Sequence, residues 1–542
     1  MARKIRSRYK ITGNLTTISP IHIGGVGGNA DTDMALAVNG EGKFYLPATS
    51  LAGALRAYMA TLNSKITNKI WGFQEKEGDN GHASFVIVED AVINSAIVEI
   101  RDGVAIDRYS GTAAEGMKFD RAILPKGVKI PISLILERDA KLSDSEWQEC
   151  QNAFAQLITA LEEGEIYLGG AKSRGLGRVK LYDTRIIEED LLSPAGILNI
   201  LKNQEKTVNW GKVYASGQNC QNKLDITIKW SPIGSVMVKS EGDGMAVDIL
   251  PLVSGVSGGL TFVIPGSSLK GVWRSQAERI IRTVCNHSLN YEDKDKFDQQ
   301  VKLELIKTLF GAPAELDENQ NQLGYLSCLA VDDCFAKKPM TSNSSVSITD
   351  ATQKSENNGK DEYLMTSHQW ASITEATSDS SLRNCLNNMG LKDTQLGYHV
   401  GIDRWTGSGA EGFLYTTLEP FGVNWENIEI SLNLHRLKQY EKLENERLKK
   451  ENLPPKNSYL PTLALFLLVL RDFMESKIPI GFGVNRGMGA IQVEKVEING
   501  KGIDNDDLKA LSQATLTSFY DLDNNLLTNL NSHWKSWLNG GK

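Results

Sequence analysis

The chain has 542 residues, which is long for a single hydrophobic core and predicts two to four domains. Its 41% hydrophobic and 23% charged residues are ordinary for folded globular proteins and exclude wholesale disorder. No run of eighteen apolar residues occurs and no apolar segment follows the first basic residues, so we expect neither a membrane span nor a signal peptide, and a cytoplasmic location.

The net charge of -7 is unusual for a protein whose main partner would be nucleic acid. Basic residues are nevertheless concentrated locally, in the first ten residues and in the segment GGAKSRGLGRVKL. The six cysteines form no CxxC pair, which argues against a zinc ribbon and a disulfide framework. We therefore expect reduced cysteines and a local basic surface.

Four sequence blocks occur twice in the same order, which predicts two copies of one domain. The paired blocks are LPATSLAGALR at 46–56 and IPGSSLKGVWR at 264–274, GHASFVIVEDA at 81–91 and GYLSCLAVDDC at 324–334, IDRYSGTAAEG at 106–116 and IDRWTGSGAEG at 402–412, and SRGLG at 173–177 and NRGMG at 485–489. The third pair is identical at seven of eleven positions, far above chance.

The elements follow the same order in both copies. Period-two alternation predicts a strand at the start of each copy, a helix follows each PxxSLxGxxR block, and a second helix precedes each glycine-rich block. This order predicts an α+β fold of two tandem, modified ferredoxin-like (RRM-like) domains. The predicted parts are a first domain at 1–182, a linker with one short helix at 183–222, a second domain at 223–498 with a long, partly mobile insertion at about 336–395, and a C-terminal helical tail at 499–542.

Each PxxSLxGxxR block places small hydroxyls at a helix N-terminus, where backbone N–H groups and the helix dipole can hold a phosphate. The predicted RNA-binding residues of these blocks are Thr49, Ser50, Arg56, Ser267, Ser268, Lys270 and Arg274. In the alternative interpretation, Thr49 and Ser267 only cap a core helix.

The glycine-rich blocks match neither the Walker pattern nor the dinucleotide fingerprint, and their glycines allow close approach of another molecule. Four cations there are candidates for the RNA backbone, namely Lys172, Arg174, Arg178 and Arg486.

The IDRxxGxAxEG blocks predict protruding β-hairpins that wedge between stacked bases, with Met117 and Phe413 as apolar wedges. The remaining candidates are the pairs Asp107 with Arg108 and Asp403 with Arg404, which in the alternative interpretation only form ion pairs that tie each hairpin to its domain.

Acids stand in the glycine-rich loop between the first strand and the first helix of each copy. Asp31 and Asp33 in the first loop, with Asp243 and Asp248 in the second, are candidates to hold a divalent ion or to orient a 2′-hydroxyl. Solvated loop carboxylates are the alternative. His22 and His82 have no counterpart in the second copy, which excludes a histidine mechanism common to both.

The combination of PGSSLKG at a helix start, the IDRxTGxA hairpin and the SRGLG loop resembles the RAMP superfamily (repeat-associated mysterious proteins) over nearly all of both halves. The chain looks most like backbone subunits of type III CRISPR interference complexes, in a fused form similar to some type III-D systems. The resemblance implies a ferredoxin-like palm with a hairpin thumb and a glycine-rich loop in each domain. The first copy departs from the pattern by reading PATSLAG, which weakens its expected phosphate contact.

The resemblance further implies a ribonucleoprotein that holds guide RNA and cuts complementary single-stranded target RNA in antiviral defence. Its other expected partners are backbone, large polymerase-like and small effector subunits. No association with a membrane is expected. The family aspartate carries over to Asp33 and Asp248 as catalytic and metal-holding residues, with Asp31 and Asp243 in reserve, and the expected cofactor is a divalent ion, Mg²⁺. Two alternatives stay open: a catalytically inert backbone subunit, and an endonuclease that processes precursor CRISPR RNA.

Overall fold

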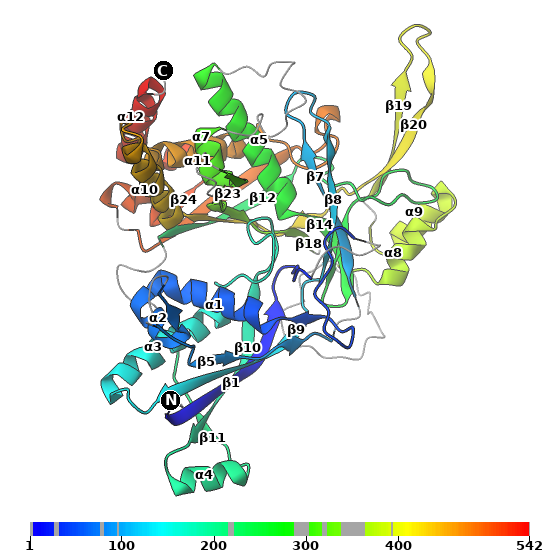
Figure 1. The fold of residues 1–542 in the computed structure, drawn as a ribbon. Coiled ribbons are helices and arrows are strands. Elements are labelled where there is room, and N and C mark those ends of the chain that lie inside the picture. Colours follow the sequence, from blue (N-terminus) through cyan, green and yellow to red (C-terminus); the bar gives the residue numbers. More distant parts are fainter. Residues whose placement is uncertain are drawn as a thin grey trace. The chain divides into compact units, whose positions relative to one another are not determined.

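The computed structural model describes residues 4–25, 32–75, 81–94, 97–214, 222–286, 303–316, 322–337, 364–391, 394–503 and 505–540. The chain forms two compact units, coloured along the sequence in Figure 1. Unit 1 comprises Met1–Gly103, Phe119–Lys172 and Leu176–Gln221, and unit 2 comprises Val104–Lys118, Ser173–Gly175 and Asn222–Lys542. No helix of the described part is long and apolar enough to cross a bilayer.

Unit 1 is built on a five-stranded antiparallel sheet with the order β11-β10-β1-β9-β5. Its strands are β1 (Ile5–Thr17), β5 (Val86–Val88), β9 (Lys129–Asp139), β10 (Val179–Asp190) and β11 (Lys206–Val208). The helices α1 (Ala48–Leu62) and α3 (Asp144–Glu162) bury residues in the same hydrophobic cluster as this sheet. The small elements of unit 1 are β2 (Tyr45–Leu46), α2 (Ser64–Trp71), β3 (Phe73–Gln74), β4 (Gly81–His82), β6 (Ala91–Val92) and α4 (Pro194–Leu201).

Unit 2 repeats this sheet with the order β24-β23-β12-β22-β17. Its strands are β12 (Lys223–Pro232), β17 (Leu329–Val331), β22 (Ile428–Asn433), β23 (Ile491–Lys501) and β24 (Gln513–Leu516). The helices α5 (Gly266–Cys285) and α11 (Tyr459–Met474) bury residues in the cluster that also contains the sheet.

Unit 2 carries further elements beside this sheet. They are β13 (Val253–Val256), β14 (Gly259–Ile264), α7 (Glu304–Phe310), β15 (Ala312–Leu316), β16 (Gln322–Tyr325), β18 (Cys334–Lys337), α8 (Ser367–Thr374), α9 (Asp379–Asn388), β21 (Asn424–Trp425), α10 (Leu434–Lys450), η2 (Val484–Arg486), η3 (Asp506–Leu511), η4 (Phe519–Asp521) and α12 (Asn524–Gly540).

The two sheets share the strand–helix–strand–strand–helix–strand order of a ferredoxin-like unit, in which the fourth strand lies beside the first. The sequence pattern explains the local structure, because β1 buries Tyr9, Ile11 and Leu15 on alternate positions. Of the α11 residues, most are buried, as expected for a helix that is apolar on nearly all sides. The predicted α+β fold of two tandem domains is confirmed.

Each repeat also contains one long hairpin. The first hairpin pairs β7 (Glu99–Ile106) with β8 (Ala113–Ile123), and the second pairs β19 (Gln395–Ile402) with β20 (Gly409–Glu419). The second hairpin projects from unit 2 in Figure 1.

Three segments differ in detail from their sequence-based description. Residues 183–222, expected to be a linker with one helix, contribute the end of β10, α4 and the edge strand β11. The tail beyond 499 adds strand β24 to the sheet before its helix α12. The insertion at about 336–395 contains α8 and α9, and its residues 338–363 and 392–393 lie outside the described part.

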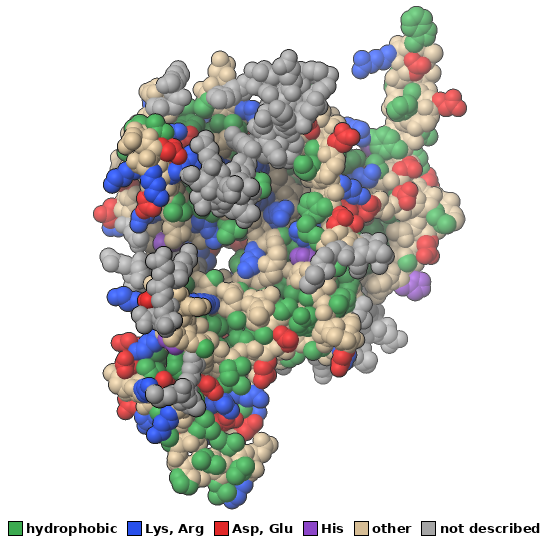
Figure 2. Space-filling view, viewed as in Figure 1, with side chains coloured by type: hydrophobic (Ala, Val, Ile, Leu, Met, Phe, Trp, Pro, Cys, Tyr) green, Lys and Arg blue, Asp and Glu red, His purple; other side chains and the backbone are tan. Residues whose placement is uncertain are grey.

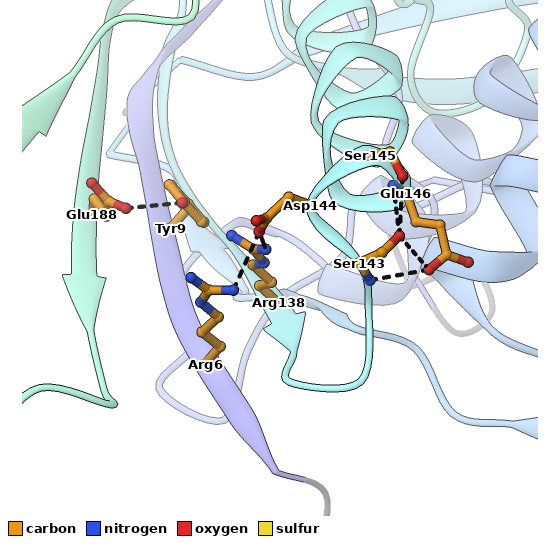
Figure 3. Close-up of polar contacts among 8 residues, drawn as sticks. All are labelled: Arg6, Tyr9, Arg138, Ser143, Asp144, Ser145, Glu146 and Glu188. Carbon is orange, nitrogen blue, oxygen red and sulfur yellow. Dashed lines mark hydrogen bonds and ion pairs between the residues drawn. The ribbon is translucent and has the colours of Figure 1, made fainter.

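The basic N-terminal strand is paired with acids of unit 1. Arg6 and Arg138 both donate to the Asp144 carboxylate (Figure 3). Arg8 pairs with Glu137 at 3.1 Å. Each described arginine of this strand is therefore paired with an acid of unit 1, while Arg6 remains exposed.

Helix α3 begins at a capping box. The Ser143 hydroxyl accepts the Glu146 N–H at 3.3 Å, and the Glu146 carboxylate accepts the Ser143 N–H at 3.1 Å (Figure 3). These two bonds satisfy two backbone donors that the helix itself leaves unpaired.

Removal of the cap should destabilise unit 1. We expect Ser143→Ala to lower the free energy of unfolding by about 1 kcal/mol, the usual cost of losing a serine cap. Chemical denaturation monitored by circular dichroism measures this difference. The matched control is Ser64→Ala, at an exposed serine in the first turn of α2, and an equal loss in both variants would contradict the assignment.

Candidate functional site

The loop aspartate of the first repeat is held by hairpin strand β8. The backbone N–H of Asp120 donates to Oδ2 of Asp33 at 3.0 Å, and the N–H of Asp33 donates to Oδ1 of Asp120 at 2.6 Å. The N–H of Ala122 donates to the Met34 carbonyl at 3.0 Å, and Met34 forms a parallel bridge with Arg121. The loop is thus added to β8 as a short extra strand.

The second repeat holds its aspartate in the same way on β20. The N–H and the hydroxyl of Thr416 both donate to Oδ2 of Asp248, at 2.7 and 2.9 Å, and the N–H of Asp248 donates to Thr416 Oγ1 at 3.0 Å. The N–H of Leu418 donates to the Ile249 carbonyl at 2.9 Å, and Ile249 bridges Thr417 in parallel.

Asp33 and Asp248 occupy equivalent positions, because Asp120 and Thr416 stand equally far beyond Gly116 and Gly412. Both aspartates are exposed. Among the described residues, Oδ1 of neither aspartate accepts a hydrogen bond or joins an ion pair. Each repeat therefore presents a carboxylate with one oxygen fixed on the hairpin and the other available to a ligand.

The reserve aspartates are placed differently. Asp31 lies outside the described residues, and Asp243 is exposed without belonging to the loop–hairpin pairing. Within the described ranges, no group of three or more His, Cys, Asp or Glu side chains gathers as metal ligands. Mg²⁺ is commonly held by only one or two carboxylates together with substrate phosphates, so the free oxygen of Asp33 in the first repeat, and that of Asp248 in the second, would each fit such an ion when RNA supplies the rest.

A second carboxylate in each repeat holds the start of the first helix. The N–H of Ala48 donates to Asp90 Oδ1 at 2.6 Å, and the N–H of Gly266 donates to Asp333 Oδ1 at 2.8 Å. No side chain caps α1 or α5 from the cap position itself, which is a proline in both. The alternative that Thr49 and Ser267 are helix caps therefore does not apply.

The hydroxyl-bearing residues of these helix starts remain accessible, since Thr49, Ser50 and Ser267 are exposed and Ser268 is half-buried. The arginines that end the blocks are partly engaged within the protein. Arg56 donates to the Gly72 carbonyl at 2.9 Å, and Arg274 donates to the Gly311 carbonyl at 3.4 Å and to Glu278 at 2.8 Å.

Lys270 is buried, with 6% of its surface exposed. Its ammonium donates to the hydroxyls of Ser173 and Ser327, at 3.0 and 2.7 Å, in unit 2. Burial, with the nearby charges of Arg174 and Arg274, lowers the pKa of Lys270 to about 7. The lysine expected to contact phosphate thus lies beneath the surface, inside a group of cations.

The glycine-rich loops place their arginines differently. Arg174 and Lys172 are exposed, whereas Arg178 is half-buried and its Nε donates to the Gly164 carbonyl at 3.3 Å. In unit 2, a Cβ at Gly175 would lie 1.9 Å from Asp333 Oδ1, so only glycine fits beside the capping carboxylate.

The second repeat contains a stack of side chains between its glycine-rich loop and its hairpin. The Arg486 guanidinium lies over the Tyr415 ring at 5.3 Å and donates to the Tyr415 hydroxyl, and the Tyr415 ring stacks on His399 at 5.1 Å. His399 Nε2 lies 3.0 Å from Glu419 Oε1. Arg486 is therefore oriented by the hairpin, while its side chain stays exposed.

The two hairpin tips are built alike. Asp107 Oδ1 accepts the N–H groups of Tyr109 and Ser110, at 2.9 and 2.8 Å. Asp403 Oδ1 accepts those of Trp405 and Thr406, at 2.7 and 3.4 Å, and these bonds lower the pKa of Asp403. The repeated aspartates thus hold the turn.

The arginines beside these turns are placed differently. In unit 2, Arg108 pairs with the buried Glu278 at 2.6 Å, whereas Arg404 is exposed. The predicted wedge residues Met117 and Phe413 are 40% and 65% exposed. Apolar side chains are visible on the second hairpin in Figure 2. Trp405, in the turn of this hairpin, is 96% exposed.

A model of the RAMP superfamily matches residues 14–180 and 251–492, one region in each half of the chain. The chain belongs to the RAMP superfamily. The first region includes Asp33 and the hairpin of the first repeat. The second region includes α5 and the hairpin of the second repeat, and it begins just after Asp248. Membership suggests a CRISPR-associated, RNA-binding effector subunit. No curated protein matches the chain.

Several residues that hold the loop aspartates, the helix starts and Arg486 were not identified from the sequence. Asp90 and Asp333 are the next-to-last residues of the second repeated block, so their duplication was the signal of a shared role in holding the helix. Asp120 and Thr416 differ between the repeats, and no one-dimensional comparison marks them as partners of the loop aspartates. His399 stands where the first repeat has Gly103 and left no repeated signal.

The buried Lys270 should make folding stability depend on pH. The folded chain releases this proton near pH 7, while the unfolded chain keeps it to its ordinary pKa of 10.5. The unfolded state binds more protons between these values, so this contribution to the free energy of unfolding rises with pH across that window. The rise should be absent in Lys270→Met.

Urea denaturation at several pH values between 6 and 10 measures the difference between wild type and Lys270→Met. Each unit of pKa shift corresponds to about 1.4 kcal/mol, so a partial shift is measurable. Lys172→Met, at an exposed lysine, is the matched control. A difference between Lys270→Met and wild type that is constant with pH would contradict the assignment.

Proposed function

We propose that this RAMP protein is the fused double backbone subunit of a type III CRISPR interference complex, of a III-D-like kind. In this proposal it holds guide RNA and cuts the paired target RNA with one site per repeat. The observation that carries the proposal is the equivalent placement of Asp33 and Asp248, each fixed through Oδ2 to a hairpin strand. A purely structural carboxylate would not need an exposed second oxygen in both repeats.

The reaction assigned to each site is transesterification within the target strand. The free oxygen of the aspartate accepts the proton of a 2′-hydroxyl, and the 2′-oxygen forms a bond to the adjacent phosphorus. The bond from phosphorus to the 5′-oxygen breaks, and that oxygen takes a proton from water. The products are a 2′,3′-cyclic phosphate and a 5′-hydroxyl end.

The hairpins supply the geometry that the reaction needs. A regular A-form helix does not place the 2′-oxygen in line with the leaving 5′-oxygen, and displacement of a nucleotide allows that alignment. Met117 and Phe413 are exposed apolar side chains of the hairpin strands and suit the displacement. Asp33 is hydrogen-bonded to β8, the strand that carries Met117, and Asp248 to β20, the strand that carries Phe413. In each repeat one strand thus carries the displacing side chain and holds the carboxylate.

A divalent ion, Mg²⁺, is part of the proposal. Asp33 in the first repeat, and Asp248 in the second, would hold it together with RNA phosphates. When bound, the ion would offset the negative charge that develops on the phosphate.

RNA binding is assigned to the exposed polar residues of the helix starts and glycine-rich loops. Thr49, Ser50 and Ser267 offer hydroxyls, and Lys172, Arg174 and Arg486 offer positive charge. These contacts read the backbone, so guide pairing supplies the sequence specificity. Lys270 is left out of this assignment because it is buried and donates to Ser173 and Ser327.

Separate mutation of the two aspartates tests the proposal. In the complex purified through this chain with its guide, labelled complementary RNA should give two cuts. Asp33→Ala should remove one product and Asp248→Ala the other, each by about a hundredfold or more, the usual contribution of a general base. Chelation of divalent ions should stop both cuts, and added Mg²⁺ should restore them.

Asp243→Ala is the matched control, because Asp243 belongs to the same loop as Asp248 but not to the pairing with the hairpin. Loss of a product in that variant would move the assignment to Asp243. Retention of both products in Asp33→Ala and Asp248→Ala would leave the chain as an inert backbone subunit. Cleavage of precursor CRISPR RNA by the isolated chain would instead favour a processing endonuclease.

A further inference from the structure

The two loop–hairpin pairs use different side chains at the same hairpin position. In the second repeat, the N–H of Asp248 donates to Thr416 Oγ1, and the hydroxyl donates onward to Asp248 Oδ2. In the first repeat, the N–H of Asp33 donates to Asp120 Oδ1, and the Asp120 side chain makes no second hydrogen bond to Asp33. Oδ2 of Asp248 thus accepts two hydrogen bonds from its partner, and Oδ2 of Asp33 accepts one.

The backbone bond is common to both repeats, so the side chain is the variable part. The amide of the hairpin residue donates to Oδ2 in each case, at 3.0 Å in the first repeat and 2.7 Å in the second. Substitution of the hairpin side chain therefore leaves this bond in place. It removes the hydrogen bond from the N–H of the loop aspartate to the hairpin side chain. In the second repeat it also removes the bond from the Thr416 hydroxyl to Oδ2 of Asp248.

We infer that Asp120 and Thr416 are positioning residues, which hold each loop aspartate on the hairpin strand so that Oδ1 is the oxygen presented to the RNA. This role rests on the proposed cleavage, in which Asp33 and Asp248 accept the proton of the 2′-hydroxyl. Asp120 and Thr416 act through Asp33 and Asp248 and do not themselves accept the proton. Because Asp248 receives one more hydrogen bond, its carboxylate is the more firmly oriented of the two.

The expected effects are confined to the site that carries the substitution. Thr416→Val keeps the shape of the side chain and the backbone bond but removes the hydroxyl. The variant loses both hydrogen bonds between the hydroxyl and Asp248, so we expect kcat for the second cut to fall at least tenfold, a change equivalent to about 1.4 kcal/mol. KM should stay unchanged because the guide binds the target, and the first cut provides an internal control in the same reaction.

Conservative variants separate positioning from simple damage. Thr416→Ser retains the hydroxyl and should restore the second cut. Asp120→Ala should slow the first cut about tenfold, since Asp33 loses its side-chain acceptor. Asp120→Thr reproduces the arrangement of the second repeat and should keep the first cut at the wild-type rate or above it.

The experiment is single-turnover and steady-state cleavage by the guide-loaded complex, with thermal unfolding of each variant measured in parallel. An unchanged rate in Thr416→Val, a change in KM alone, or an equal loss at both cuts would overturn the inference for Thr416. If Asp120→Thr abolishes the first cut as completely as Asp33→Ala does, then Asp120 takes part in the reaction directly and its positioning role is overturned.

Failure of the inference is distinct from failure of the proposed function. If Asp33→Ala and Asp248→Ala leave both cuts intact, the cleavage proposal fails and the positioning role fails with it. If those variants abolish their cuts while Thr416→Val and Asp120→Ala do not slow them, only the positioning role is overturned.

Discussion

Backbone hydrogen bonds between a glycine-rich loop and a hairpin strand determine the arrangement of the candidate site in each repeat. The bonds from Ala122 to Met34 and from Leu418 to Ile249 add the loop to the hairpin as a short parallel strand. Once this register is set, the preceding aspartate can only meet the hairpin residue opposite to it.

Several basic side chains of this chain make ion pairs or hydrogen bonds within the folded protein. The arginines of the first strand are paired with acids, and Lys270 is buried against two serine hydroxyls. The chain can therefore carry a net charge of -7 and still present a few exposed cations where nucleic acid would run. The local environment of each lysine and arginine decides its role, and the total charge does not.

The duplicated domain has retained its framework and changed its side chains. Both sheets keep one strand order, both helix starts use an aspartate from the following strand end, and both hairpin tips close around an aspartate. In contrast, Asp120 corresponds to Thr416 and Gly103 to His399. Backbone geometry is constrained by pairing and packing, whereas an exposed side chain is free to differ, and the two candidate sites can therefore differ in strength.

The sequence by itself determined the duplication, the ferredoxin-like order, the two hairpins and the loop aspartates, because repeated blocks and hydrophobic periodicity are local signals. Only the tertiary structure decided which side chains meet. The partners of Asp33 and Asp248 lie 87 and 168 residues away along the chain, and the capping aspartates and the burial of Lys270 likewise depend on distant segments. Contacts over such separations are set by sheet register and helix packing, which no local pattern encodes.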